Sequence, residues 1–191
     1  NLSPDYMRQA LEAILTRLQV EYLDVLILHR PDPLTSAQET AESCIRLREE
    51  GKFTHLGVSN MSVWETDRLQ RHYDQPLFCS QLQISLGHRP IVDEIVEANT
   101  SEGGGRGADG MLSYAERHHM LLEAWGALDR GRFVSATSSD PEDEGTRVLI
   151  ERIAGEQGLP PSAIALAWLR LLNIVPVIGS VRPERISEAA A

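Results

Sequence analysis

The sequence is poor in cysteine, contains no long apolar run and has fewer basic than acidic residues. Only Cys44 and Cys79 are present, and they lack the CxxC spacing of metal and redox sites, so we expect reduced thiols within a core. No apolar stretch approaches the roughly 20 residues that a membrane helix needs, and no charged-then-apolar leader is present. We therefore expect a cytoplasmic protein that does not cross a membrane.

The charge balance narrows the class of partner. The chain has 28 acidic and 18 basic residues, which gives a formal net charge of -10. Such a charge disfavours nonspecific binding to nucleic acid and to anionic membrane surfaces, so a small molecule is the expected partner. The 191 residues suffice to bury one sizeable core, and we expect residues 1–191 to belong to one domain.

Apolar, strand-like segments alternate with amphipathic helical segments along the chain. The run Val25-Leu26-Ile27-Leu28 is typical of a strand buried on both faces. Two of the helical segments open with a capping-box pattern, at Ser36 and at Ser62. Strict alternation predicts an α/β fold with a parallel sheet. The five predicted strands cover residues 20–29, 53–59, 77–82, 120–125 and 174–179.

Side chains capable of binding or catalysis occur at the end of each predicted strand. They are His29, the pair Ser59 and Asn60, Gln81 beside Ser80, Trp125, and the group Gly179, Ser180, Arg182 and Arg185. The carboxyl ends of parallel strands share one edge of a sheet, which is where α/β folds bind ligands. The arrangement is expected of a (β/α)8 barrel active site with a phosphate site beyond the last strand.

Most of these groups have both a functional and a structural interpretation. His29 could reach a substrate while a neighbour holds its other ring nitrogen, or it could be a hydrogen-bonded core histidine. Ser59, Asn60 and Gln81 offer donors and acceptors for a carboxamide, although any of them could cap a helix. Trp125 offers a flat surface on which a ring could stack, or it could be a core residue.

The residues after the fifth strand suit an anion. The Ser180 hydroxyl, the backbone amides at the start of the last helix and the guanidinium groups of Arg182 and Arg185 could bind phosphate. The alternative is a pair of solvated arginines.

Two further patterns are interpreted as structural. The segment Gly105–Gly110 satisfies G-x-G-x-x-G, but the polar residues 99–104 before it are not a strand, so we predict a loop. His118 and His119 are neighbours that point to different faces of a helix, and we expect no metal site.

Five segments together resemble the aldo-keto reductase family, and most closely its bacterial "HRPDP" branch of predicted oxidoreductases. They are LTRLQVEYLDVLILHRPDPL, GKFTHLGVSNMS, SQLQISLGH, LLEAWGAL and IVPVIGSVRPERI. Each segment alone is a weak signal, whereas the set in this order is highly specific and covers most of the chain.

The resemblance implies a (β/α)8 TIM barrel, of which this chain supplies about the last five βα units, and an NADPH-dependent reduction of an aldehyde or ketone. It also implies roles for individual residues. His29 is the catalytic histidine, Ser59, Asn60 and Gln81 bind the nicotinamide carboxamide, Trp125 stacks on the nicotinamide ring, Ser180 and Arg185 bind the 2'-phosphate, and Arg182 is an additional contact. Gly179 stands where family members often carry a basic residue.

Family members have about three further strands at the N-terminus, which carry a catalytic aspartate, tyrosine and lysine, and these residues cannot be assigned in this chain. The C-terminal tail that shapes the substrate pocket is also short here. We therefore expect the chain alone to be neither a stable monomer nor an active reductase. The alternative function is an inactive, truncated barrel that binds a nucleotide or a partner protein, since the family includes a potassium-channel β-subunit branch.

Overall fold

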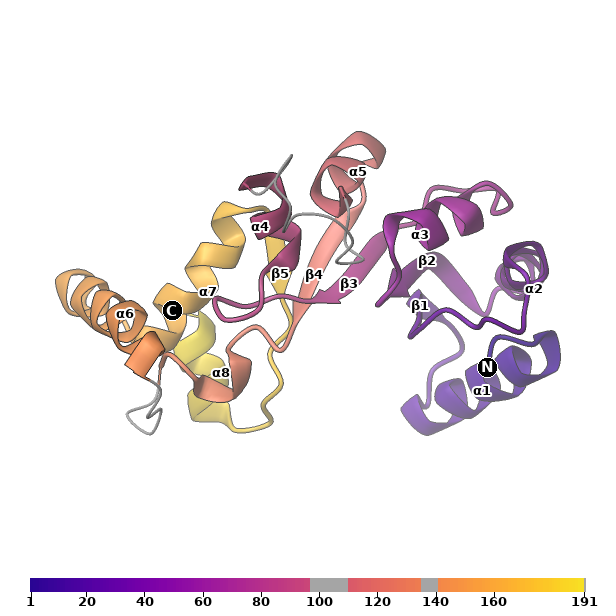
Figure 1. Ribbon diagram of the computed structural model, residues 1–191. Coiled ribbons are helices and arrows are strands. Elements are labelled where there is room, and N and C mark those ends of the chain that lie inside the picture. Colours follow the sequence, from indigo (N-terminus) through magenta and orange to yellow (C-terminus); the bar gives the residue numbers. More distant parts are fainter. Residues whose placement is uncertain (97–109, 135–140, 191) are drawn as a thin grey trace. The chain divides into compact units, whose positions relative to one another are not determined.

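Strands and helices alternate along the chain, as the sequence predicts (Figure 1). The structure is a computed structural model that describes residues 1–96, 110–134 and 141–190. It divides into two units, one of residues 1–81 with 94–121 and one of residues 82–93 with 122–191.

In chain order the elements are α1 (Pro4–Leu18), β1 (Leu23–Leu28), α2 (Ala37–Glu49), β2 (Phe53–Ser59), α3 (Val63–Gln70), β3 (Cys79–Gln83), α4 (Pro90–Val96), α5 (Met111–His118), β4 (Leu121–Trp125), the short 3-10 helices η1 (Asp129–Gly131) and η2 (Pro141–Asp143), α6 (Glu144–Gln157), α7 (Pro161–Leu171), β5 (Ile174–Pro176) and α8 (Pro183–Ala190).

The strand pairings in each unit are parallel. In the first unit, β1 pairs with β2 from Leu23↔Phe53 to Leu28↔Val58, and β2 pairs with β3 at Ser59↔Gln81. In the second unit, β4 pairs with β5, between residues 122–124 and 174–176. Parallel neighbours need a crossover connection, and helices supply it here. The predicted α/β class with a parallel sheet is therefore confirmed.

Both predicted capping boxes are present and fix where α2 and α3 begin. The Ser36 hydroxyl accepts a hydrogen bond from the backbone N of Glu39, whose carboxylate accepts one from the backbone N of Ser36. Ser62 and Glu65 make the same reciprocal pair at the start of α3. Because each box satisfies two otherwise unpaired backbone donors, the chain leaves each strand and enters the next helix at a defined residue.

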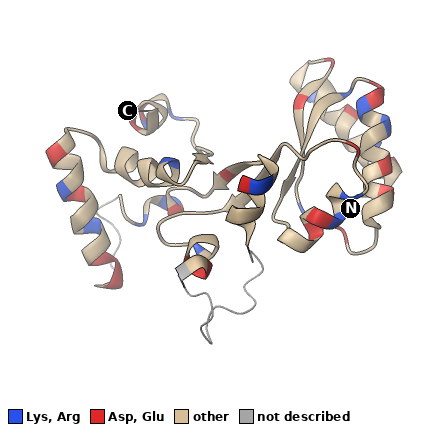
Figure 2. Ribbon diagram, turned by 90° about the horizontal axis from the view of Figure 1, so that it is seen from above, with Lys and Arg blue, Asp and Glu red and all other residues tan. Residues whose placement is uncertain are grey.

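The core of the first unit lies between its strands and helices. Figure 1 shows α1, α2 and α3 alongside the β1–β2 pair. Both cysteines are buried free thiols, as predicted, and burial raises the pKa of Cys44 to about 12. Figure 2 shows most Lys, Arg, Asp and Glu residues on helices and loops rather than on strands. This distribution agrees with strands that are predicted to be buried.

Several boundaries differ from the sequence prediction for identifiable reasons. β1 begins at Leu23, whose backbone N donates to Lys52 O, while the two residues before it are exposed. β5 ends at Pro176 instead of residue 179, although the backbone N of Val177 still donates to Ala124 O over 2.8 Å. α4, of seven residues, was not predicted, although it begins at a proline. The predicted loop at Gly105–Gly110 lies outside the described residues except for Gly110.

We predict that Gly57→Ala destabilises the full-length protein. A Cβ at this position of β2 would lie 2.4 Å from Cys79 Sγ and 3.2 Å from a side-chain atom of Ile27. The first contact is shorter than packed atoms allow and the second is tight, so we expect the free energy of unfolding to fall by about 1–3 kcal/mol in urea denaturation.

The matched control is Gly155→Ala, because a Cβ at that helical glycine would meet nothing within 4 Å. Alanine is the better helix former, so this control should gain about 0.5–1 kcal/mol. Equal effects of the two substitutions would contradict the close approach of β2 and β3.

Candidate functional site

Hydrogen bonds join the ends of three neighbouring strands in the first unit. The Ser59 hydroxyl donates to the backbone O of Gln81 over 2.9 Å, and the backbone N of Asn60 donates to the same oxygen over 3.0 Å. The Asn60 side-chain Nδ2 donates to Ser59 Oγ (2.8 Å) and to the backbone O of His29 (3.2 Å). Four sequence-predicted site residues are therefore directly linked.

Strand register explains why Ser59 and Gln81 share one face. The two residues are opposite each other in the β2–β3 ladder, and side chains alternate between faces along a strand. Ser80 therefore belongs to the other face, where it is fully buried. Its hydroxyl has no hydrogen-bond partner among the described residues. Of the pair Ser80 and Gln81, only Gln81 lies on the face of the site.

The conformation of Asn60 turns its side chain back toward the strand ends. Its φ of 54° lies in the left-handed region, which asparagine adopts more readily than most residues. Ser62, two residues later, is already the N-cap of α3. A sharp turn at Asn60 thus fits between the end of β2 and the next helix.

The loop after β1 is held by Asp32. Its carboxylate accepts hydrogen bonds from the backbone N of Leu2 (2.7 Å), the backbone N of Leu34 (3.0 Å) and the Thr35 hydroxyl (3.0 Å). These bonds keep the pKa of Asp32 below its ordinary value, the bond from Leu2 contributing most. His29, the first residue after β1, keeps an exposed side chain.

A cavity of about 630 Å³ lies beside this loop in the first unit. Asp32, Leu34, Met61 and Arg68 are among its lining residues, and His29 is not. The cavity combines apolar and charged groups but includes none of the residues predicted for the site.

The second unit contains a cavity of about 760 Å³. Gly179, Ser180 and Arg185 line it, as expected of the residues after the last strand. The other lining residues are Gly126, Ala127, Leu128, Arg130, Gly131, Val134, Pro160, Pro161, Ser162, Val177, Ile178 and Glu188. Ser162 Oγ is buried and has no hydrogen-bond partner in the described parts of the chain. The lining of this cavity therefore includes both charged and polar residues.

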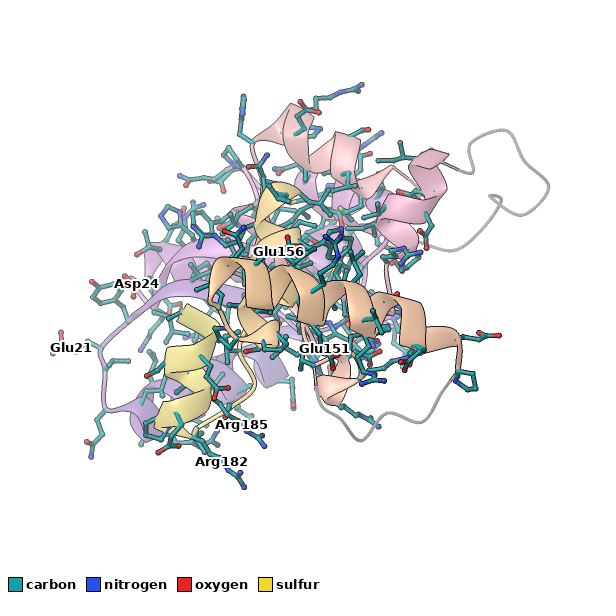
Figure 3. All side chains as sticks on the ribbon, turned by 90° about the vertical axis from the view of Figure 1, so that its left-hand side faces the viewer. Glu21, Asp24, Glu151, Glu156, Arg182 and Arg185 are labelled. Atoms are coloured by element: carbon teal, nitrogen blue, oxygen red, sulfur yellow. The ribbon has the colours of Figure 1, made fainter. Side chains whose placement is uncertain are left out.

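Arg182 and Trp125 are not among the residues that line this cavity. Figure 3 shows the Arg182 and Arg185 side chains extending outward from the start of α8. Arg182 does not line the cavity, but its backbone N donates to Ser180 Oγ over 3.2 Å. Trp125 ends β4, is partly buried, and is followed by Gly126, which begins the cavity wall.

An ion-pair cluster braces the loop that forms this wall. The guanidinium of Arg132 bonds both carboxylate oxygens of Asp143, at 2.6 and 2.8 Å, and lies 3.7 Å from Asp129. Asp143 is 4% exposed, whereas the Arg132 side chain is 37% exposed, so only the carboxylate of this pair is shielded from water. On another side, a Cβ at Gly87 would lie 2.6 Å from Asp129 Oδ2, so a larger residue there would displace the Asp129 side chain.

Sequence reasoning did not identify Arg130, Arg132, Asp143 or Ser162. Residues Asp140–Glu144 are an acidic stretch of the sequence, but nothing local indicates that one of these acids pairs with Arg132. The two arginines in residues Asp129–Arg132, after β4, could have indicated this part of the site from the sequence. A charged segment directly after a predicted strand occupies a place where ligands bind.

The whole chain, residues 1–191, matches the sequence profile of the Aldo/keto reductase family. The chain belongs to the aldo-keto reductase family. It is 32% identical over 187 residues to 6-dehydroglucose reductase of Agrobacterium fabrum, covering 97% of this chain and 56% of that protein. It is 29% identical over 188 residues to oxidoreductase YdhF of Escherichia coli, covering 97% and 57%.

Solved aldo-keto reductase structures have the same fold. A thermostable aldo-keto reductase in complex with the inhibitor epalrestat is 26% identical, with a TM-score of 0.79, and the match covers 99% of this chain and 61% of that one. A glycerol dehydrogenase from Gluconobacter oxydans is also 26% identical, with a TM-score of 0.78 and coverages of 98% and 58%. The predicted family and the (β/α)8 barrel class are thus confirmed. The aldo-keto reductase chain spans a little over half the length of these curated relatives.

The described residues contain neither a metal-binding cluster nor a membrane-spanning helix. No group of three or more His, Cys, Asp and Glu side chains in residues 1–96, 110–134 and 141–190 could hold a metal ion. No helix within these ranges is long and apolar enough to cross a membrane. The assignment to the "HRPDP" branch stays a prediction.

We predict that Asn60→Ala destabilises the full-length protein more than Asn60→Gly. Glycine removes the two side-chain hydrogen bonds to His29 O and Ser59 Oγ, which should lower the free energy of unfolding by about 1–3 kcal/mol. Alanine removes the same bonds and also places a Cβ in the left-handed region, at a further cost of about 1 kcal/mol. Urea denaturation of both variants measures the difference. An alanine variant as stable as the glycine variant would contradict the strained turn.

Proposed function

We propose that the full-length protein is an NADPH-dependent oxidoreductase that reduces an aldehyde or ketone to an alcohol. The observation that carries the proposal is the hydrogen-bonded group of His29, Ser59, Asn60 and Gln81 at the strand ends of an aldo-keto reductase. Similarity to a 6-dehydroglucose reductase supports the direction of the reaction. We further propose that residues 1–191 belong to one barrel domain, that the protein is cytoplasmic and that its partner is a small carbonyl compound.

The second unit has groups that suit the cofactor. Its cavity of about 760 Å³ is lined by Arg185 and Ser180, whose guanidinium and hydroxyl groups would bind the 2'-phosphate. Trp125, next to the cavity wall, would stack on the nicotinamide ring.

His29 and its neighbours would orient and activate the reacting groups. When bound, the reduced nicotinamide supplies the hydride. The His29 imidazole would donate a hydrogen bond to the carbonyl oxygen of the substrate as negative charge develops there. Ser59, Asn60 and Gln81 would hold the carboxamide, so that one face of the ring is turned toward the substrate. The bonds among them hold the Ser59 hydroxyl, the Asn60 side chain and the backbone of Gln81.

We predict that His29→Ala lowers kcat about a hundredfold or more in the full-length enzyme. Cofactor affinity should change little, because the imidazole acts on the carbonyl in the transition state. The measurement is carbonyl-dependent oxidation of NADPH, beside NADPH titration by fluorescence. The matched control is His72→Ala, which removes another exposed histidine of the same unit, outside the site. An unchanged kcat together with a lower unfolding midpoint would favour the core-histidine interpretation.

We predict that Arg185→Ala weakens NADPH binding about 10- to 100-fold and leaves NADH nearly unaffected. The reason is the loss of a charge-assisted hydrogen bond to the 2'-phosphate, which NADH lacks. Arg182→Ala should have a smaller effect, since Arg182 does not line the cavity. Equal losses for both cofactors in Arg185→Ala would contradict a 2'-phosphate contact.

The same two assays separate an enzyme from a binding module. NADPH binding followed by oxidation on addition of a carbonyl compound supports the reductase. Tight NADPH binding without oxidation by a broad panel of aldehydes and ketones would favour the nucleotide-binding alternative.

A further inference from the structure

The imidazole of His29 has no hydrogen bond that orients it within the described parts of the chain. The side chain is exposed and makes no hydrogen bond or ion pair with another described residue. The backbone O of His29, by contrast, accepts the hydrogen bond from Asn60 Nδ2. The position of the imidazole therefore depends on how the backbone on both sides of His29 is held.

The backbone before His29 is fixed by the sheet, whereas the backbone after it is not. Leu28 is the last residue of β1 and is buried in the parallel ladder. The chain then runs through residues 29–36 before α2 begins at Ala37. Pro31 and Pro33 restrict φ in this loop, but a segment outside the sheet also needs contacts of its own to adopt one conformation.

Asp32 supplies these contacts with both of its carboxylate oxygens. Oδ2 accepts hydrogen bonds from the backbone N of Leu2 over 2.7 Å and from the Thr35 hydroxyl over 3.0 Å. Oδ1 accepts one from the backbone N of Leu34 over 3.0 Å. Leu2 lies before α1 and is 30 positions away in the sequence. The carboxylate therefore closes a turn within the loop and also joins the loop to a separate part of the first unit.

A carboxylate suits this arrangement, and an amide does not. Each oxygen of Asp32 faces a backbone N–H, and a backbone N–H needs an acceptor. An asparagine at this position would turn its NH2 group toward the N–H of either Leu2 or Leu34, so one bond would be lost whichever way the amide lies. The same bonds keep the pKa of Asp32 below its ordinary value, the bond from Leu2 contributing most, so the carboxylate is ionised at neutral pH.

We propose that Asp32 is a positioning residue for carbonyl reduction, because it fixes the loop directly after His29 and thereby sets where the imidazole meets the carbonyl oxygen. This inference rests on the proposed function, since it takes His29 as the donor to that oxygen. A misplacement of about 1 Å at a reacting group can cost about a hundredfold in rate. Asp32 acts through the backbone of the loop and is not itself a catalytic residue.

The test compares Asp32→Asn with Asp32→Ala in the full-length protein. We expect kcat for carbonyl-dependent oxidation of NADPH to fall about 10-fold in Asp32→Asn and up to about 100-fold in Asp32→Ala. The dissociation constant of NADPH should change less than about twofold, because the loop acts on the carbonyl side of the reaction. The matched control is Asp24→Asn, which removes an exposed carboxylate of β1 and should leave kcat unchanged.

A double-mutant cycle with His29→Ala separates positioning from a general loss of stability. If Asp32 acts through the imidazole, Asp32→Asn lowers kcat in the unaltered protein but changes it less than about twofold in the His29→Ala protein. Equal falls of kcat in both backgrounds would overturn the inference, because they are the result of a structural role alone. An unchanged kcat in Asp32→Ala would overturn it as well.

The NMR signal of the His29 imidazole gives a readout that does not depend on activity. The signal is identified by its absence from the His29→Ala protein. Asp32→Asn should shift it, whereas Asp24→Asn should leave it in place, and an unshifted signal in Asp32→Asn would overturn the inference. If the unaltered protein oxidises NADPH with no aldehyde or ketone, the proposed function itself is wrong, and the His29 signal still decides whether Asp32 positions the imidazole.

Discussion

The hydrogen bonds around Asn60 are the constraint on which the proposed active site depends. One residue in a left-handed conformation uses its backbone N and its side-chain Nδ2 to join the ends of β1, β2 and β3. Parallel strands bring their carboxyl ends to one edge of a sheet, but they do not fix the side chains there. The bonds from Asn60 to Ser59 Oγ and to the backbone oxygens of His29 and Gln81 fix the Ser59 hydroxyl, the Asn60 side chain and the backbone of the three strand ends. Preorganisation of this kind lowers the entropy lost when a ligand binds.

The second unit achieves a comparable rigidity with charge instead of neutral hydrogen bonds. Arg132 reaches across the loop after β4 to Asp143, which is almost fully buried. Removing one partner of such a pair leaves an uncompensated charge, so the brace stabilises one conformation of the loop. The loop in turn presents Arg130 and the backbone from Gly126 to Leu128 to the cavity. Arg130 has a φ of 56°, and this strained backbone is maintained because the surroundings fix it.

Local sequence signals predicted the helices and strands and the site residues of the first unit. The capping boxes at Ser36 and Ser62 depend on residues three apart, and the apolar run of β1 depends on consecutive residues, so both can be read from short segments. His29 and Asn60 were found because each directly follows a strand. Their function as the predicted catalytic and carboxamide-binding residues stays a prediction.

Features that depend on tertiary placement could not be predicted. The pair Arg132–Asp143 joins residues that are 11 positions apart, with no periodic pattern between them. Ser162 follows two prolines and resembles an ordinary helix start, whereas its buried, unpaired hydroxyl is visible only in the folded chain. Even the pair Ser80 and Gln81 needed the strand register before one member could be placed on the site face.

The most direct test of the central claim uses NADPH that carries deuterium at one or the other of its two C4 hydrogen positions. The measurement is whether that deuterium appears in the alcohol product. The claim is that fixed strand-end groups hold the nicotinamide with one face toward the carbonyl substrate. With the full-length protein and a reducible aldehyde, the account predicts that one labelled form transfers its deuterium to the alcohol and the other transfers none. Transfer from both forms, or no transfer to any carbonyl compound despite bound NADPH, would contradict it.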